Sequence, residues 1–183
     1  MPRISAATNA AQRENTKRAI LESFGKLLYS RGLPGLTMTD VAKNAGIGRT
    51  AVYNYFADMG ELLVAYALDE TERFLHELDE GITGVTNPID QLAVYIRLQI
   101  EDLARRHLPP GPAMRSMLSP ESYARLGKHV SELQMVLANI LSDAITEKYI
   151  PENDIRELAM LVHGSLSSSA GRAEDAPDVQ TRE

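Results

Sequence analysis

The apolar side chains of this chain recur at the three- and four-residue spacing of α-helices, and no stretch alternates with the two-residue period of a strand. The pattern predicts helices over about residues 12–31, 37–45, 49–55, 60–80, 89–103, 113–118, 120–149 and 151–166. We predict an all-α protein of about nine helices in all, eight of which have these approximate bounds. Pro151 stands at the start of the last of these helices, a position at which proline is favoured.

Proline, glycine and loss of periodicity divide the chain into parts. Residues 1–11 show no period and are predicted to form a mobile arm, and the polar residues 173–183 to form a flexible tail. The three short helices before residue 60 form a small head that includes this arm. The longer helices of residues 61–172 would make a larger helical body.

The second and third predicted helices meet at a glycine turn, which is typical of a helix-turn-helix. Ala45 is small enough for the two helices to approach closely, and Gly46 can adopt the positive φ that ends a helix. Ile47 can fill the angle between the helices, with Val52 and Phe56 in the core behind the turn. Thr37-Met38-Thr39-Asp40 has the pattern of a capping box at the start of the second helix.

The third helix would expose side chains suited to nucleic acid. Arg49, Thr50, Asn54 and Tyr55 can reach base edges in a groove or the phosphates beside it. Each residue also has a plain structural reading. Arg49 could be an ordinary solvated cation, Asn54 a spectator, and the neighbouring Tyr53 a core aromatic.

Charge is distributed unevenly, although the chain as a whole is acidic with a net charge of −6. Residues 1–56 carry eight basic and three acidic side chains, a net charge of +5, which leaves −11 for the remainder. A basic head on an acidic body is typical of a nucleic-acid-binding protein. The acidic body could repel DNA except at the head, or it could simply favour solubility.

The segment from Thr37 to Phe56, followed by Glu61-Leu62-Leu63, resembles the DNA-binding signature of the TetR family of repressors. The resemblance covers roughly residues 16–63, and the remainder matches in architecture only. It implies a homodimeric regulator that binds a double-stranded DNA operator, with a small-molecule ligand site in the body. It also implies that the last two helices of each protomer form the dimer as a four-helix bundle.

The resemblance assigns DNA contacts by position. Arg49 and Thr50 would face bases, Tyr53 and Tyr55 would touch phosphates, and Thr37 and Thr39 would lie near a phosphate at the second helix. The full set of predicted DNA-binding residues is Lys17, Thr37, Thr39, Arg49, Thr50, Tyr53, Asn54 and Tyr55.

Two positions depart from the family pattern. Members often have glycine where Thr50 stands, so Thr50 could read a base or merely occupy the position. Members also often have a phosphate-binding lysine where this chain has Met59. That contact would then be lost or be made by Lys17 or Arg13.

Ligand contacts in the body are harder to predict from the sequence. Polar or adaptable side chains near apolar faces are the candidates, with ordinary core or surface as the alternative for each. The predicted ligand-pocket residues are Tyr95, Gln99, His107, Met114 and Met117. Small residues near the end of the last helix, such as Gly164 and Ser168, would allow close approach of a second protomer or would mark a fraying helix.

The sequence does not predict an enzyme, and it predicts no catalytic residues, metal site or cofactor. The chain has no cysteine, and its four histidines are far apart with no zinc-binding spacing. Gly46-Ile47-Gly48 follows a helix and lacks the third glycine of a dinucleotide loop. The sequence shows no secretory signal or membrane span, which favours a cytoplasmic location.

Together these features predict a sequence-specific transcriptional regulator. The leading hypothesis is a repressor that a small-molecule ligand releases from a near-palindromic operator. The alternative, suggested by Thr50 and Met59, is a helical small-molecule-binding protein whose DNA recognition is weak or lost.

Overall fold

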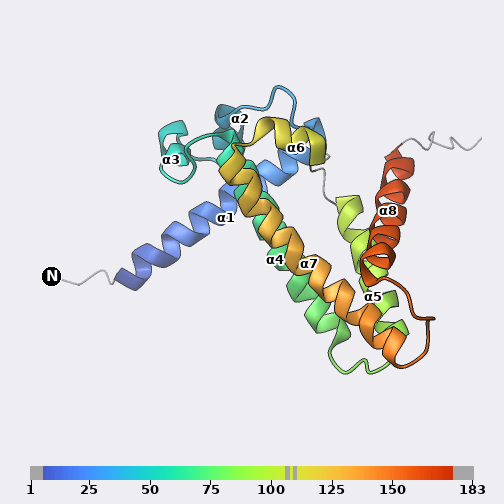
Figure 1. Ribbon diagram of the computed structural model, residues 1–183. Coiled ribbons are helices and arrows are strands. Elements are labelled where there is room, and N and C mark those ends of the chain that lie inside the picture. Colours follow the sequence, from blue (N-terminus) through green and yellow to red (C-terminus); the bar gives the residue numbers. More distant parts are fainter. Residues whose placement is uncertain (1–5, 106–107, 109–110, 175–183) are drawn as a thin grey trace, which may run out of the picture. The chain divides into compact units, whose positions relative to one another are not determined.

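The computed structural model describes residues 6–105, 108 and 111–174, and every element in these ranges is a helix (Figure 1). This confirms the all-α fold, with eight helices in the described residues against the nine expected. The helices are α1 Ala6–Arg31, α2 Met38–Asn44, α3 Arg49–Tyr53, α4 Met59–Ile82, α5 Pro88–Arg105, α6 Gly111–Met117, α7 Pro120–Thr146 and α8 Ile155–Glu174. No helix among the described residues is both long enough and apolar enough to cross a membrane.

Four helix boundaries differ by three or more residues from those predicted. Helix α1 begins at Ala6, so residues 6–11 are its first turns and are not part of an arm. Helix α7 ends at Thr146, close before Lys148, which has a positive φ of 63°. Helix α8 begins at Ile155 and extends to Glu174.

The start of α8 is set by an aspartate, and the prediction that Pro151 begins the last helix was wrong. The backbone N–H of Arg156 donates to Oδ1 of Asp154 at 2.7 Å. A side-chain acceptor of this kind satisfies an N–H that has no partner within the helix, so Asp154 provides the stronger start signal.

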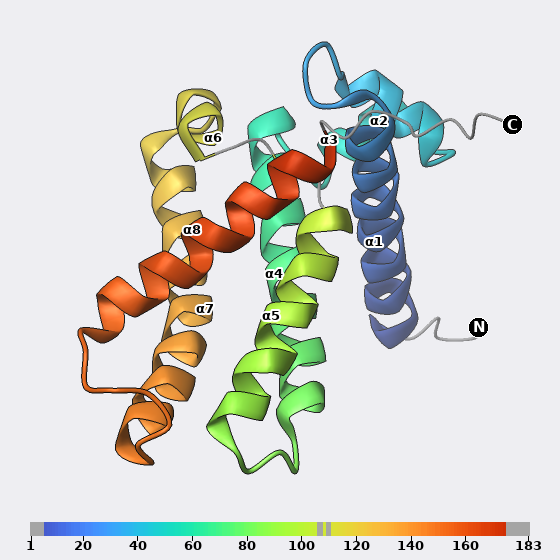
Figure 2. The same cartoon turned by 90° about the vertical axis from the view of Figure 1, so that its right-hand side faces the viewer.

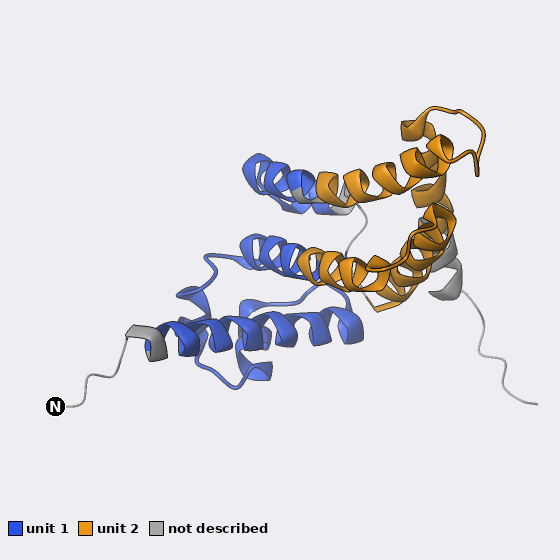
Figure 3. Ribbon diagram, turned by 90° about the horizontal axis from the view of Figure 1, so that it is seen from below, with its two compact units in different colours: residues 1–70, 106–128 blue, residues 71–105, 129–183 orange. Residues whose placement is uncertain are grey.

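The described chain divides into two compact units, coloured separately in Figure 3. Unit 1 is residues 1–70 and 106–128, and unit 2 is residues 71–105 and 129–183. Helices α4 and α7 each contribute residues to both units.

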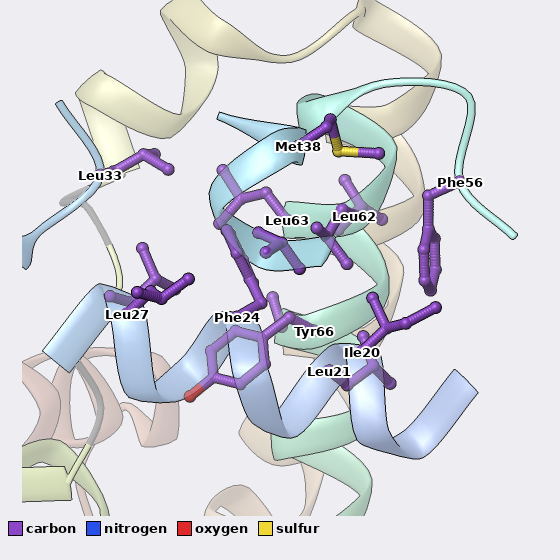
Figure 4. Close-up of a cluster of buried hydrophobic side chains, with 14 of the residues drawn as sticks. Ile20, Leu21, Phe24, Leu27, Leu33, Met38, Phe56, Leu62, Leu63 and Tyr66 are labelled. Atoms are coloured by element: carbon purple, nitrogen blue, oxygen red, sulfur yellow. The ribbon is translucent and has the colours of Figure 1, made fainter. Parts of the chain in front are cut away.

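Unit 1 is built around the buried face of α1. Phe24 and Leu27 of α1 lie against Leu63 and Tyr66 of α4, and the rings of Phe24 and Tyr66 meet edge-on with centroids 5.5 Å apart (Figure 4). Gly25 makes this approach possible, since a Cβ there would lie 2.9 Å from the Tyr66 ring. The head therefore has a dry core that fixes α1 and the first part of α4.

Unit 2 has its own core between α4, α5, α7 and α8, and α8 runs beside α5 (Figure 2). Its centre is Phe74 of α4 and Tyr95 of α5, whose rings meet edge-on with centroids 6.1 Å apart. The four-residue spacing of Ile96 and Ile100 predicts one buried face for α5, but Tyr95 and Leu98 are its deeply buried residues and Ile100 is 48% exposed. Val130 of α7 is also exposed.

Candidate DNA-binding and ligand sites

Helix α2 begins with the predicted capping box. The Thr37 hydroxyl donates to Oδ2 of Asp40 and accepts the backbone N–H of Asp40 at 3.2 Å. The backbone N–H of Thr37 donates to the same carboxylate oxygen at 3.0 Å. These hydrogen bonds hold the pKa of the Asp40 carboxyl below its usual range, with Arg31 and Lys43 adding to the effect. Because the hydroxyl proton of Thr37 is already donated to Asp40, its main role here is to start the helix.

The capping box gives a direct test of this local structure. We expect Thr37→Ala to lower the free energy of unfolding by about 0.5–2 kcal/mol, because the backbone N–H of Asp40 loses its acceptor and the Asp40 carboxylate loses the hydroxyl donor. Urea denaturation followed by circular dichroism measures this change. Thr37→Ser keeps the hydroxyl group and serves as the control. If both variants lost the same free energy of unfolding, the hydroxyl group of the capping box would contribute nothing to stability.

The turn between α2 and α3 has the geometry that its residues predict. Gly46 has a φ of 69°, and the backbone N–H of Ile47 returns to the carbonyl of Ala42 at 3.0 Å. Ile47 is half-buried and packs on the core of unit 1. Val52 and Phe56 are buried, as predicted. The turn and the two buried side chains fix the angle at which α3 leaves α2.

A side-chain bridge that the sequence did not reveal ties α2 to α1. The buried hydroxyl of Ser23 donates to Oδ1 of Asn44 at 2.8 Å and lies 3.2 Å from the carbonyl oxygen of Val41. Ser23 occupies the buried side of α1 beside Phe24, and its only sequence signal was a polar residue at the edge of an apolar face. This contact anchors the C-terminal end of α2.

Helix α3 carries a row of exposed side chains. Arg49, Thr50, Tyr53 and Asn54 are all exposed. The guanidinium of Arg49 lies over the Tyr53 ring, 5.5 Å from its centroid, and one of its nitrogens is 3.4 Å from the tyrosine hydroxyl. Tyr53 is 41% exposed and is absent from the buried core, so its reading as a core aromatic was wrong. The stacking orders two side chains that would otherwise move freely.

The other predicted DNA contacts lie in the same unit. Tyr55 is half-buried against the core, and the guanidinium of Arg13 from α1 lies 5.3 Å from its ring centroid. Lys17 is half-buried on α1, and Thr39 is exposed on α2. Met59, where a lysine was expected, packs against the core of unit 1. Arg13 therefore places a cation beside Tyr55, as Arg49 does beside Tyr53.

Unit 2 contains a cleft of about 740 Å³ between α5, α7 and α8. Its lining residues are Gln99, Val130, Ser131, Leu133, Gln134, Met135, Ala138, Ile155, Arg156, Ala159, Met160 and His163. This volume lies in the range of small-molecule sites.

The predicted ligand residues are distributed between the two units. Gln99 lines the cleft, and Tyr95 is fully buried in the core of the same unit. Met114 is buried in the core of unit 1, and Met117 is exposed. His107 lies outside the described residues. Of the five candidates, the structure therefore brings only Tyr95 and Gln99 together in unit 2.

Sequence reasoning missed His163, which lines the cleft from α8. Ile155, Ala159 and His163 follow one another at four-residue spacing, so one histidine interrupts an otherwise apolar helix face. That interruption was the available signal. Burial lowers the pKa of His163, which favours the neutral imidazole.

Comparison with known proteins bears on both units. Residues 20–66 match the family model described as "Bacterial regulatory proteins, tetR family". An HTH-type transcriptional regulator from Haemophilus influenzae is 35% identical over 74 residues, which are 40% of this chain and 36% of that protein. One from Mycobacterium tuberculosis is 32% identical over 88 residues, 48% of this chain and 44% of that protein. The chain thus spans less than half the length of these curated relatives.

Solved structures share the fold over most of the chain. The TetR family regulator PfmR from Thermus thermophilus has a TM-score of 0.70 and 20% identity, covering 89% of each chain. The regulator FadR from Bacillus subtilis, solved in complex with stearoyl-CoA, has a TM-score of 0.71 and 19% identity, covering 84% of each chain. At these identities the likeness concerns the fold.

Proposed function

We propose that the chain is a member of the tetR family of bacterial regulatory proteins, whose model residues 20–66 match, and that it is a homodimeric transcriptional regulator that a small molecule releases from its operator. The observation that carries the proposal is the set of exposed side chains at α3, namely Arg49, Thr50, Tyr53 and Asn54. They stand on a helix-turn-helix that has the expected turn at Gly46 and a buried core. Residues 1–60 are the DNA-binding part in this proposal. The rest of the chain as far as residue 172 supplies the ligand site and the dimer.

The proposed DNA interface divides into base contacts and phosphate contacts. Arg49, Thr50 and Asn54 face base edges in the major groove, where arginine pairs with guanine and asparagine with adenine. Tyr53 and Tyr55 donate their hydroxyl protons to phosphates, and Lys17 and Thr39 support them from α1 and α2. Arg13, stacked on Tyr55, takes the place of the lysine that is missing at Met59.

The proposed dimer uses α7 and α8, which carry exposed apolar side chains. Met135 on α7 and Met160 and Leu161 on α8 are each more than half exposed. Apolar side chains on two adjacent helices are suited to a four-helix seam between two copies related by a twofold axis. Such a dimer presents two heads to successive major grooves of a near-palindromic site.

The ligand site of this proposal is the cleft of unit 2. That a regulator of the same fold was solved with stearoyl-CoA supports a ligand site in the helical body. A ligand that binds better to one spacing of the two heads shifts the dimer towards that spacing. If that spacing does not match the operator, the ligand releases the protein from DNA.

Arg49 provides the test of the DNA-binding assignment. We expect Arg49→Ala to weaken binding to the protein's own upstream DNA by roughly 1–3 kcal/mol, about 5- to 150-fold in Kd. The loss combines a base contact with the stacking that orders Tyr53. Mobility shift over a salt series measures it, since phosphate contacts weaken with salt in proportion to their number.

The matched control for this experiment is Arg97→Ala. Arg97 is an exposed arginine on α5, paired with Glu101 and outside the head. Unchanged affinity in Arg49→Ala would refute the assignment of α3 as the recognition helix. Wild-type binding with no preference for upstream DNA would favour the alternative, a small-molecule-binding protein that has lost DNA recognition.

A further inference from the structure

Two residues that line the cleft of unit 2, and Tyr95 in the core beside one of them, carry buried polar atoms that lack partners among the described residues. The Tyr95 hydroxyl, Oε1 of Gln99 and Nε2 of His163 are buried and have no hydrogen-bonding partner within the part of the chain that the structure describes. Gln99 and His163 both line the cleft, and the rings of His163 and Tyr95 meet edge-on with centroids 6.2 Å apart. Buried polar atoms without partners are rare in folded proteins, so they mark a place where a ligand can supply hydrogen bonds.

The rest of the lining is mainly apolar. It includes Leu133, Met135 and Ala138 of α7 and Ala159 and Met160 of α8. Methionine side chains adapt to irregular apolar shapes, which suits a hydrocarbon body without a fixed outline. The cleft therefore combines these apolar side chains with Gln99 and His163, which we call its polar floor.

The polar floor is suited to an uncharged group. Arg156 is the only formally charged side chain among the lining residues within the described chain, and it is exposed. Burial lowers the pKa of His163, which favours the neutral imidazole. An ammonium group at the floor would lose its hydration without an anionic partner among the lining residues, and an anion there could pair only with the exposed Arg156.

We propose that this cleft binds a lipophilic alcohol or phenol, whose hydroxyl group reaches Gln99 and His163 and whose hydrocarbon body lies between α7 and α8. This rests on the proposed function, since it names the ligand class of that same site. A hydroxyl group can donate its proton to Oε1 of Gln99 and accept the Nε2–H of His163. One group thereby satisfies an acceptor and a donor, which neither a carboxylate nor an alkane can do.

A second copy of the chain is a poorer occupant of the floor. The large apolar side chains that α7 and α8 expose to a partner, Met135, Met160 and Leu161, would leave the two polar atoms unsatisfied. Met135 and Met160, however, belong both to the rim of the cleft and to the proposed dimer seam. A bound alcohol therefore lies against the interface that sets the spacing of the heads.

Calorimetric titration of the full chain with three ten-carbon probes tests the ligand class. Decan-1-ol, decanoate and decylamine share a hydrocarbon body and differ in the charge of the end group. We expect the alcohol to bind at least about tenfold more tightly than either charged probe. Decanoate or decylamine binding as tightly as the alcohol would overturn the proposal.

Two variants test the contacts at the floor. Gln99→Leu and His163→Leu should each weaken decan-1-ol binding by roughly two- to tenfold, the effect of one neutral hydrogen bond. His76→Leu, on an exposed histidine of α4, is the matched control and should leave the affinity unchanged. Unchanged affinity in both floor variants would overturn the proposal.

Thermal unfolding separates a ligand contact from a structural role. Because the two polar atoms have no partner among the residues that the structure describes, neither leucine variant should lower the Tm of the ligand-free chain. A lower Tm in both would show that the atoms are satisfied internally and would overturn the proposal. The titration contains no DNA, so its failure and a failure of operator binding are observed independently.

Discussion

Replacing Leu161 with glutamate should convert the proposed dimer to monomers at micromolar concentration and reduce operator affinity by at least about a hundredfold. Leu161 is 67% exposed on α8, beside the equally exposed Met160. In a twofold dimer each substitution occurs twice, so two carboxylates enter one apolar seam. Burying an unpaired charge costs several kcal/mol, and about 3 kcal/mol already corresponds to a hundredfold weaker association.

The loss of DNA affinity follows from the loss of the dimer. A monomer places one head in one major groove, and the second half-site must then be bound by a separate molecule. Sedimentation velocity measures the oligomeric state, and mobility shift on the same protein measures the affinity. The two measurements should change together.

Ile100→Glu is the matched control for Leu161→Glu. Ile100 is also an exposed aliphatic residue, 48% exposed, but it lies on α5, outside the proposed seam. We expect this variant to remain dimeric and to bind DNA as the wild type does. If Leu161→Glu stays dimeric with an unchanged dissociation constant, α8 does not form the seam.

The helix-turn-helix was predictable because its determinants are local. Thr37 and Asp40, three residues apart, form the capping box of α2. Gly46 has a positive φ, which residues with a side chain rarely adopt. These preferences act within a few residues, so a single sequence reveals them. The positions of Val52 and Phe56 in the core followed from the same local geometry.

The helix boundaries that were mispredicted depend on competition between local signals. Pro151 is compatible with a helix start, but Asp154 has a side chain that accepts the N–H of Arg156 and so determines the first turn. Residues 6–11 lack an apolar period, yet they extend α1 because nothing in their sequence stops a helix. Periodicity predicts where a helix packs and says less about where it ends.

The cleft could not have been predicted, because it depends on how helices from distant parts of the chain pack. Gln99 and His163 are 64 positions apart and line the same cavity only because α8 runs beside α5. The apolar period on α5 pointed to Ile96 and Ile100, while packing buries Tyr95 and Leu98 instead. Met114, equally plausible by sequence, is buried in the core of unit 1.

Phe24→Ala should lower the free energy of unfolding by about 3–5 kcal/mol, the largest stability change we expect from one side chain of the head. Phe24 is completely buried at the centre of the cluster in Figure 4, and its ring packs edge-on against Tyr66. Removing the ring leaves a cavity between α1 and α4. Gly25 already lies close against the Tyr66 ring, so the two helices cannot move together to fill the cavity. Guanidinium denaturation followed by circular dichroism measures the loss.

Tyr29→Ala is the control, because Tyr29 is an aromatic residue of the same helix that is 64% exposed. We expect it to cost less than about 1 kcal/mol, since most of its surface stays in water in the folded chain. Folded domains are stable by only about 5–15 kcal/mol, so Phe24→Ala should also raise the fraction of unfolded heads and weaken DNA binding. A cost below about 1 kcal/mol for Phe24→Ala would show that this core does not hold α1 to α4. The hydrogen bond from Ser23 of α1 to Asn44 would then not fix α2 relative to α4.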